Sequence, residues 1–183
     1  MKNMFKQSKH LLGTNTGFSL VETLVAIGIM TAVVSGIMAL VYQGSVASRY
    51  QADQITATYL AADAVEYIRS ERDSYWLEDP VGNEFASWSQ TINNECYDVC
   101  TIDTRIGEES IDWCDGSCPP LDYNESTGFY GYGNGDASRF TRSIDIDAAS
   151  DSLEMAVTVS WPRNNFTESV TIEQSIYDYR DSN

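Results

Sequence analysis

The stretch that decides the fold is Gly17-Phe18-Ser19-Leu20-Val21-Glu22, which is followed by an uncharged run over residues 23–48. Within that run, residues 24–42 contain only Thr31 and Ser35 as clearly polar side chains. In helical form, at about 1.5 Å per residue, these residues come close to the roughly 30 Å hydrocarbon thickness of a bilayer. The stretch therefore predicts a transmembrane helix over residues 18–42.

Glu22 is the one misfit at the start of this span. A carboxylate inside a membrane costs on the order of 2–3 kcal/mol unless it finds a partner. Glu22 is therefore a candidate functional residue, and any role proposed for it has to identify the group that pairs with its carboxylate.

These residues resemble the entry signature of the type IV pilin family. A short basic leader precedes Gly17, an aromatic residue follows at Phe18, and Glu22 is the fifth residue after the glycine. The resemblance implies that a membrane prepilin peptidase cleaves after Gly17 and N-methylates Phe18. It also implies that Glu22 is the assembly residue, paired with the new amine of a neighbouring subunit. A buried ion pair in low dielectric is strongly favoured over two unpaired charges.

The charge of the chain is distributed asymmetrically. The formal net charge is −16, yet all three lysines and the single histidine precede Gly17. The remainder carries eight arginines and 27 acidic residues, a formal side-chain charge of −19. Positive charge beside a membrane span stays in the cytoplasm, so residues 1–17 are expected inside and the residues after Tyr42 outside. The residues after Tyr42 form the head of the protein. Because the head is so acidic, it is not expected to bind nucleic acid, although a role in DNA uptake stays open.

Residues 1–17 are interpreted as a targeting leader. The alternative is a secretory signal peptide cleaved after Ser45-Val46-Ala47. That alternative is disfavoured because the apolar region exceeds the usual run of about 7–15 residues and Glu22 interrupts its beginning.

The helix is expected to continue beyond the membrane to about Tyr75, because residues 43–76 contain no proline. Apolar side chains recur there at helical spacing and form one stripe, namely Ala57, Ala61, Ala64, Val65, Ile68 and Tyr75. Asp63, Glu66, Arg69 and Asp73 lie on the opposite side. The segment 61–76 also resembles PilV-like minor pilins, where Glu66, Arg69, Arg72, Asp73 and Trp76 hold the matching places.

Residues 77–138 are predicted to form a loop-rich insertion, because proline and glycine recur within it. The insertion contains Cys96, Cys100, Cys114 and Cys118, an even number that suits an oxidising compartment. Structural disulfides are favoured over a metal site, since the spacing is not Cys-x-x-Cys and no histidine follows residue 17. All three connectivities remain open. The nearby acids Asp112, Asp115, Asp122 and Glu125 lack the spacing of a calcium loop, so whether they bind calcium is left open.

The C-terminal residues alternate with the period of a half-buried sheet. Strands are expected at 140–146, 153–161 and 166–172, with a turn at 162–165. Three antiparallel strands with one apolar face need a cover, and the stripe at 57–75 is long enough to provide it. The expected fold is α+β and pilin-like: leader 1–17, membrane or filament-core helix 18–42, amphipathic helix 43–76, insertion 77–138 and antiparallel sheet 139–183.

No enzyme and no cofactor are expected, because a chain without histidine or lysine after residue 17 excludes the common nucleophile–base mechanisms. The first hypothesis is a type IV pilin-like subunit, either a minor pilin or a pseudopilin. Its partners would be other pilin subunits, contacted through the N-terminal helix, and the prepilin peptidase. The second hypothesis is a signal-anchored extracellular binding protein that does not polymerise. Neither identifies the filament system or a ligand of the head.

Overall fold

The computed structural model describes residues 17–78, 85–105, 111–133, 135–149 and 151–177, and these fall into two compact units that divide after Ser48. The predicted leader therefore lies outside the described residues, except for Gly17. Helix α1 (Leu20–Glu78) contributes residues to both units.

In the first unit, α1 begins two residues later than expected because Ser19 acts as its N-cap. The Ser19 Oγ accepts a hydrogen bond from the Glu22 main-chain N–H at 3.2 Å. Further along, the hydroxyls of Thr31 and Ser35 donate to main-chain carbonyls one turn earlier. These polar side chains are therefore satisfied within the helix itself, as an apolar environment requires.

The second unit confirms the amphipathic stripe on the C-terminal part of α1. Ala57, Ala61, Ala64, Val65 and Ile68 are buried, and Tyr75 is half-buried. Leu60 and Trp76 join the buried face as well. Glu66 is exposed and forms an ion pair with Arg69, with 2.5 Å between the Arg69 Nη1 and Glu66 Oε1 atoms. Arg69 is half-buried and also donates to Gln174, so it does not lie on the opposite side as expected.

The predicted loop-rich insertion proves more regular than expected. It contains helix α2 (Phe85–Glu95) and four short strands: β1 (Cys100–Ile102), β2 (Ile111–Trp113), β3 (Pro120–Asn124) and β4 (Phe129–Gly131). The helix buries Phe85, Trp88 and Ile92, whose spacings of three and four are a helical signal that sequence analysis passed over. Strands of three residues are too short to show a period.

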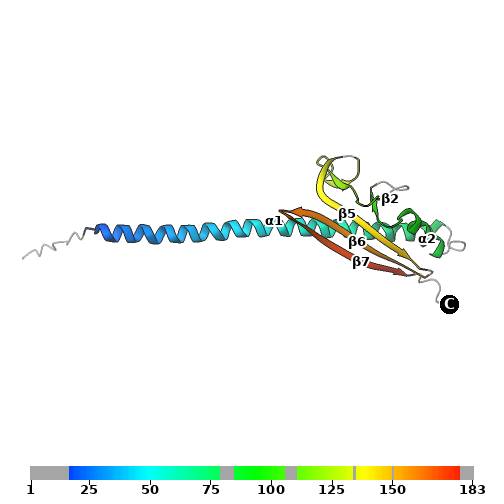
Figure 1. The fold of residues 1–183 in the computed structure, drawn as a ribbon, viewed down its shortest axis with the longest axis horizontal. Coiled ribbons are helices and arrows are strands. Elements are labelled where there is room, and N and C mark those ends of the chain that lie inside the picture. The colour runs from blue at the N-terminus through cyan, green and yellow to red at the C-terminus, as the bar shows by residue number, and fades with distance from the viewer. Residues whose placement is uncertain (1–16, 79–84, 106–110, 134, 150, 178–183) are drawn as a thin grey trace, which may run out of the picture. The chain divides into compact units, whose positions relative to one another are not determined.

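The three predicted C-terminal strands are confirmed, and each is longer than expected: β5 (Asp136–Ala148), β6 (Ser152–Arg163) and β7 (Phe166–Tyr177). They join the short strands in one sheet of seven, in which all pairings are antiparallel. Strand β5 is the centre, with β6 on one side and both β1 and β3 on the other (Figure 1).

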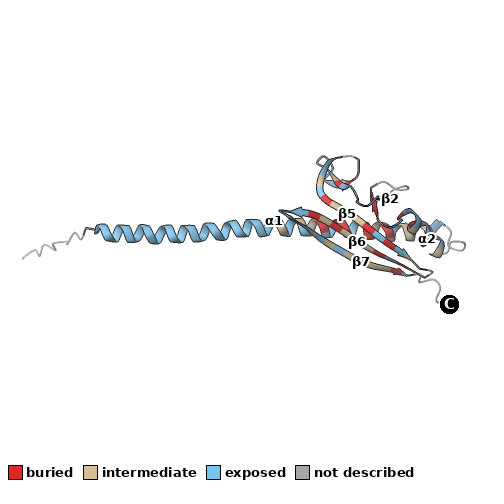
Figure 2. Cartoon of the chain, in the orientation of Figure 1, coloured by how far each residue is buried: buried red, intermediate tan, exposed pale blue. Residues whose placement is uncertain are grey.

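One hydrophobic core joins these elements. Its buried residues come from α1 beyond residue 56, from α2 and from one face of the sheet (Figure 2). On β6 the burial alternates as predicted, with Leu153, Met155, Val157, Val159 and Trp161 directed inward. The stripe on α1 is thus the cover that the sheet needed, and the coarse α+β architecture follows the expectation.

Candidate functional site

The predicted maturation and assembly residues lie at the N-terminal end of the described chain. Gly17 and Phe18 precede α1, and the Phe18 side chain is 79% exposed. Glu22 is exposed in the first helical turn, where a carboxylate interacts favourably with the helix dipole. The structure brings Glu22 together with Ser19 through the N-cap bond, and no ion pair of Glu22 is present among the described residues.

Ser19-Leu20-Val21-Glu22 also matches the Ser-x-x-Glu pattern of a capping box. This local role was overlooked from the sequence, although the spacing is visible there. The hydrogen bond that forms runs from the Glu22 main-chain N–H to the Ser19 Oγ, so Ser19 is the residue that caps the helix.

The helix that follows is apolar on every side. One candidate membrane span lies in α1, and none of its most apolar window is buried inside the protein. Its exposed large side chains run from Leu20 to Val46. Such a continuous apolar surface is far larger than the patches tolerated on soluble monomers, so it requires a bilayer or other helices around it.

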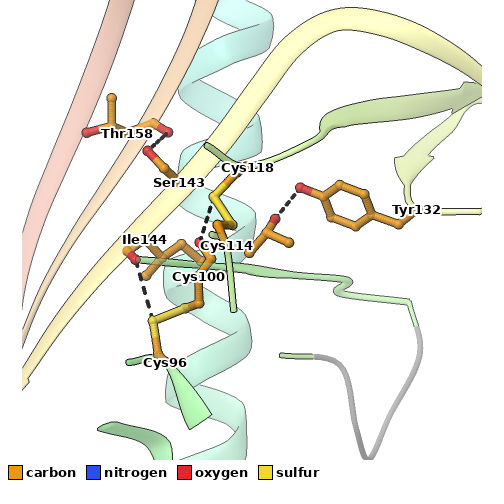
Figure 3. Close-up of a disulfide and its surroundings, with 9 residues drawn as sticks. Cys96, Cys100, Cys114, Cys118, Tyr132, Ser143, Ile144 and Thr158 are labelled. Carbon is orange, nitrogen blue, oxygen red and sulfur yellow. Dashed lines mark hydrogen bonds between the residues drawn. A yellow bond between two sulfur atoms is a disulfide. The ribbon is translucent and has the colours of Figure 1, made fainter. Parts of the chain in front are cut away.

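The four cysteines form two local disulfides, Cys96–Cys100 and Cys114–Cys118. The question that the sequence left open is settled in favour of small loops over crossed bridges. The two bridges lie near each other beside β5 (Figure 3), with the Cys96 sulfur 3.5 Å from the Ile144 carbonyl oxygen. Cys96 and Cys100 are buried, so their bridge belongs to the core.

No described group of three or more potential ligands is arranged to hold a metal ion. Of the acids considered for calcium, Asp122 accepts a hydrogen bond from the Gly133 N–H at 2.8 Å. That bond ties the loop after β4 to β3.

A buried arginine is the feature of the head that sequence analysis did not single out. Arg142 on β5 is 1% exposed, and its guanidinium donates to the carbonyl oxygens of Leu60 on α1 and Ile102 on β1. The Asp63 carboxylate lies 3.6 Å away. Arg142 thus ties the helix to two strands. The sequence did contain a signal for this site, because Arg142 occupies one of the alternating, inward-facing positions of the strand that otherwise hold apolar residues.

Asp103 is a second buried charge near this junction. Its carboxylate accepts hydrogen bonds from the Arg105 side chain and from the N–H groups of Arg105 and Tyr132. Burial acts to raise the pKa of Asp103. The hydrogen bonds from Arg105 and Tyr132, with the Arg105 charge, outweigh it and lower the pKa below its ordinary value.

Comparisons of the chain with protein-family models, curated proteins and solved structures found no match.

Proposed function

We propose that this chain is a type IV pilin-like structural subunit, a minor pilin or a pseudopilin, that is assembled into a cell-surface or secretion filament. The observation that carries this proposal is the wholly exposed apolar surface of residues 20–46, with Glu22 in its first turn. Such a helix suits a bilayer before assembly and the apolar core of a filament afterwards.

The resemblance at Gly17–Glu22 supplies the maturation step. A prepilin peptidase would cleave after Gly17 and methylate the new amine of Phe18. In the filament, Glu22 of one subunit would pair with the Phe18 amine of its neighbour. That pairing sets the axial register, because a carboxylate left alone among apolar helices is strongly disfavoured.

Mass spectrometry of the mature N-terminus tests the maturation step. We expect a chain that begins with N-methylated Phe18. An unmethylated start at Met1 or Ser48 would instead support the alternative, a signal-anchored binding protein that does not polymerise.

The assembly role of Glu22 is tested by Glu22→Ala, measured as incorporation into purified filaments and as membrane insertion in fractionated cells. We expect insertion to be normal and incorporation to be lost. Glu22→Gln is the matched control, because glutamine keeps the size of the side chain and the Ser-x-x-Gln capping pattern but carries no charge. Incorporation of the glutamine variant at the normal level would contradict the charge-pairing role.

A further inference from the structure

Strand β7 is the long free edge of the sheet. Among the described residues it pairs with β6 alone, in an unbroken register from Ser152↔Tyr177 to Arg163↔Phe166 (Figure 1). The other terminal strands, β2 and β4, have three residues each, whereas β7 has twelve.

Edge strands direct half of their main-chain N–H and C=O groups away from the sheet, where another strand can bind them. Proteins usually protect such edges by shortness, bulges, proline or charged side chains, lysine above all. Shortness protects β2 and β4. Strand β7 contains no proline, lysine or arginine and its register with β6 has no bulge, so its only charges are the carboxylates of Glu168 and Glu173.

The arginines of the three long strands all contact α1: Arg139 pairs with Asp53, Arg142 binds the Leu60 carbonyl, and Arg163 stacks on Tyr50. Glu168 of β7 lies on the same face and pairs with Arg163. The opposite face carries four carboxylates that have no ion pair among the described residues, and they belong to Asp145, Asp147, Glu154 and Glu173.

These carboxylates are packed closely by the strand register. Asp147 lies directly opposite Glu154, and Ala156 separates Asp145 from Glu173 along one row. All four line one open hollow, which reaches Gln174 and Ser175 on the free edge. Like charges directly opposite each other destabilise a sheet. A cationic partner would remove that repulsion.

We propose that the β7 edge binds an extended strand of a partner protein by β-strand addition, and that this strand carries lysine or arginine beside Glu173 and beside Ser175, across which a long side chain points toward Glu154. Its other face would place apolar side chains beside Val170 and Ile172, which pack partly exposed against the core. A second copy of this chain is disfavoured, because pairing would bring two faces of the same negative sign together. The edge offers this surface whether or not the chain polymerises.

The test uses the full chain in non-ionic detergent micelles and a short labelled peptide of alternating lysine and valine. We expect saturable binding by fluorescence anisotropy above an empty-micelle blank. Hydrogen exchange should slow on β7 and not on β2. Two matched peptides should fail to bind, one with glutamate in place of lysine and one with proline at central valines. Equal binding of the proline peptide would overturn strand addition.

The charged face is tested by the exposed-site double variant Glu154→Lys/Glu173→Lys, which should raise the Kd of the lysine peptide about tenfold or more. Asp115→Lys/Glu125→Lys makes the same net-charge change at exposed positions elsewhere on the head and should leave the Kd near its original value. Equal weakening by both variants would overturn the site. Concentration-dependent protection of β7 without peptide would overturn it too, by showing that a second copy occupies the edge. Either failure leaves filament incorporation, the readout of the proposed function, unaffected.

Discussion

In the folded head, the Arg142 guanidinium donates hydrogen bonds to two main-chain carbonyls instead of to water. These bonds explain how a buried charge is tolerated. Burial lowers the pKa of Arg142, while the nearby Tyr132, Asp63 and Asp103 act to raise it. The same guanidinium satisfies the Leu60 and Ile102 carbonyls, which belong to different elements. At the scale of single residues, Arg142 contributes through hydrogen bonds rather than through catalysis.

Replacing Arg142 with methionine should therefore destabilise the head. Two buried carbonyls would lose their donor, so we expect the free energy of unfolding to fall by about 2–4 kcal/mol. Arg139→Met on the same strand is the matched control, because the Arg139–Asp53 pair is largely exposed and should contribute less than about 1 kcal/mol. Denaturant unfolding followed by tryptophan fluorescence measures both. Equal losses of unfolding free energy in the Arg142 and Arg139 variants would contradict the role given to Arg142.

Asp103 should make the stability of the head depend on acid pH. Its pKa is lower in the folded protein than in the unfolded chain, where an aspartate has a pKa of about 3.9. The unfolded chain therefore binds the proton first as the pH falls. The contribution of Asp103 to the free energy of unfolding is complete above the pKa of the unfolded chain. It is lost as the pH falls through the pKa of the folded protein.

Asp103→Asn tests this linkage by denaturant unfolding from neutral pH down to about pH 2. The variant should be less stable at neutral pH and should show a weaker decline of stability in acid. The exposed Asp115→Asn serves as the control and should keep the original decline. An unchanged acid slope in the Asp103 variant would contradict the prediction.

At the scale of elements, the two disulfides differ in environment although their spacing is the same. Each closes a loop between cysteines four residues apart, and loop-closure entropy alone gives each about 2 kcal/mol. Cys96–Cys100 links the end of α2 to β1 with both cysteines in the core cluster. In the other bridge Cys114 is buried outside that cluster and Cys118 is partly exposed.

We therefore expect Cys96→Ala/Cys100→Ala to lower the unfolding free energy more than Cys114→Ala/Cys118→Ala, because both cysteines of the first bridge are buried in the core and only one of the second is buried. Denaturant unfolding of the two double variants gives the comparison. With limited reductant, peptide mapping should find Cys114–Cys118 opened first. The reverse order of stability or of reduction would contradict the difference in burial.

At the scale of the whole molecule, the two units depend on different surroundings. The core cluster contains no residue before Ala57, and the helical residues of the first unit are exposed along their length. The head therefore has its own core, while residues 20–46 need lipid or neighbouring helices.

A chain beginning at Ser48 should fold without detergent and unfold at the same temperature as the head of the full chain. Ser48 is kept because serine is a favourable residue at the start of a helix. Circular dichroism and size-exclusion chromatography measure the outcome. Aggregation or a large loss of thermal stability would show that the head needs the membrane segment.

The features that depend on period and composition could be predicted from the residues alone. An apolar run as long as a bilayer is thick, a stripe at helical spacing and strict alternation along β6 each predict an element, because burial on one side selects the period. The short strands β1–β4 were not predicted, because three to five residues are too few to show an alternating pattern. Their pairing depends on the strands beside them.

Contacts between groups from distant parts of the chain could be found only once the helix and the sheet were packed together. Sequence allowed three disulfide connectivities and gave no sign that Arg142 binds Leu60, because such contacts depend on how helix and sheet pack. The same holds for the carboxylates of Asp147 and Glu154, which the β5–β6 register brings face to face. Local periodicity predicted α1 and the strands β5, β6 and β7, and packing determined the contacts between them.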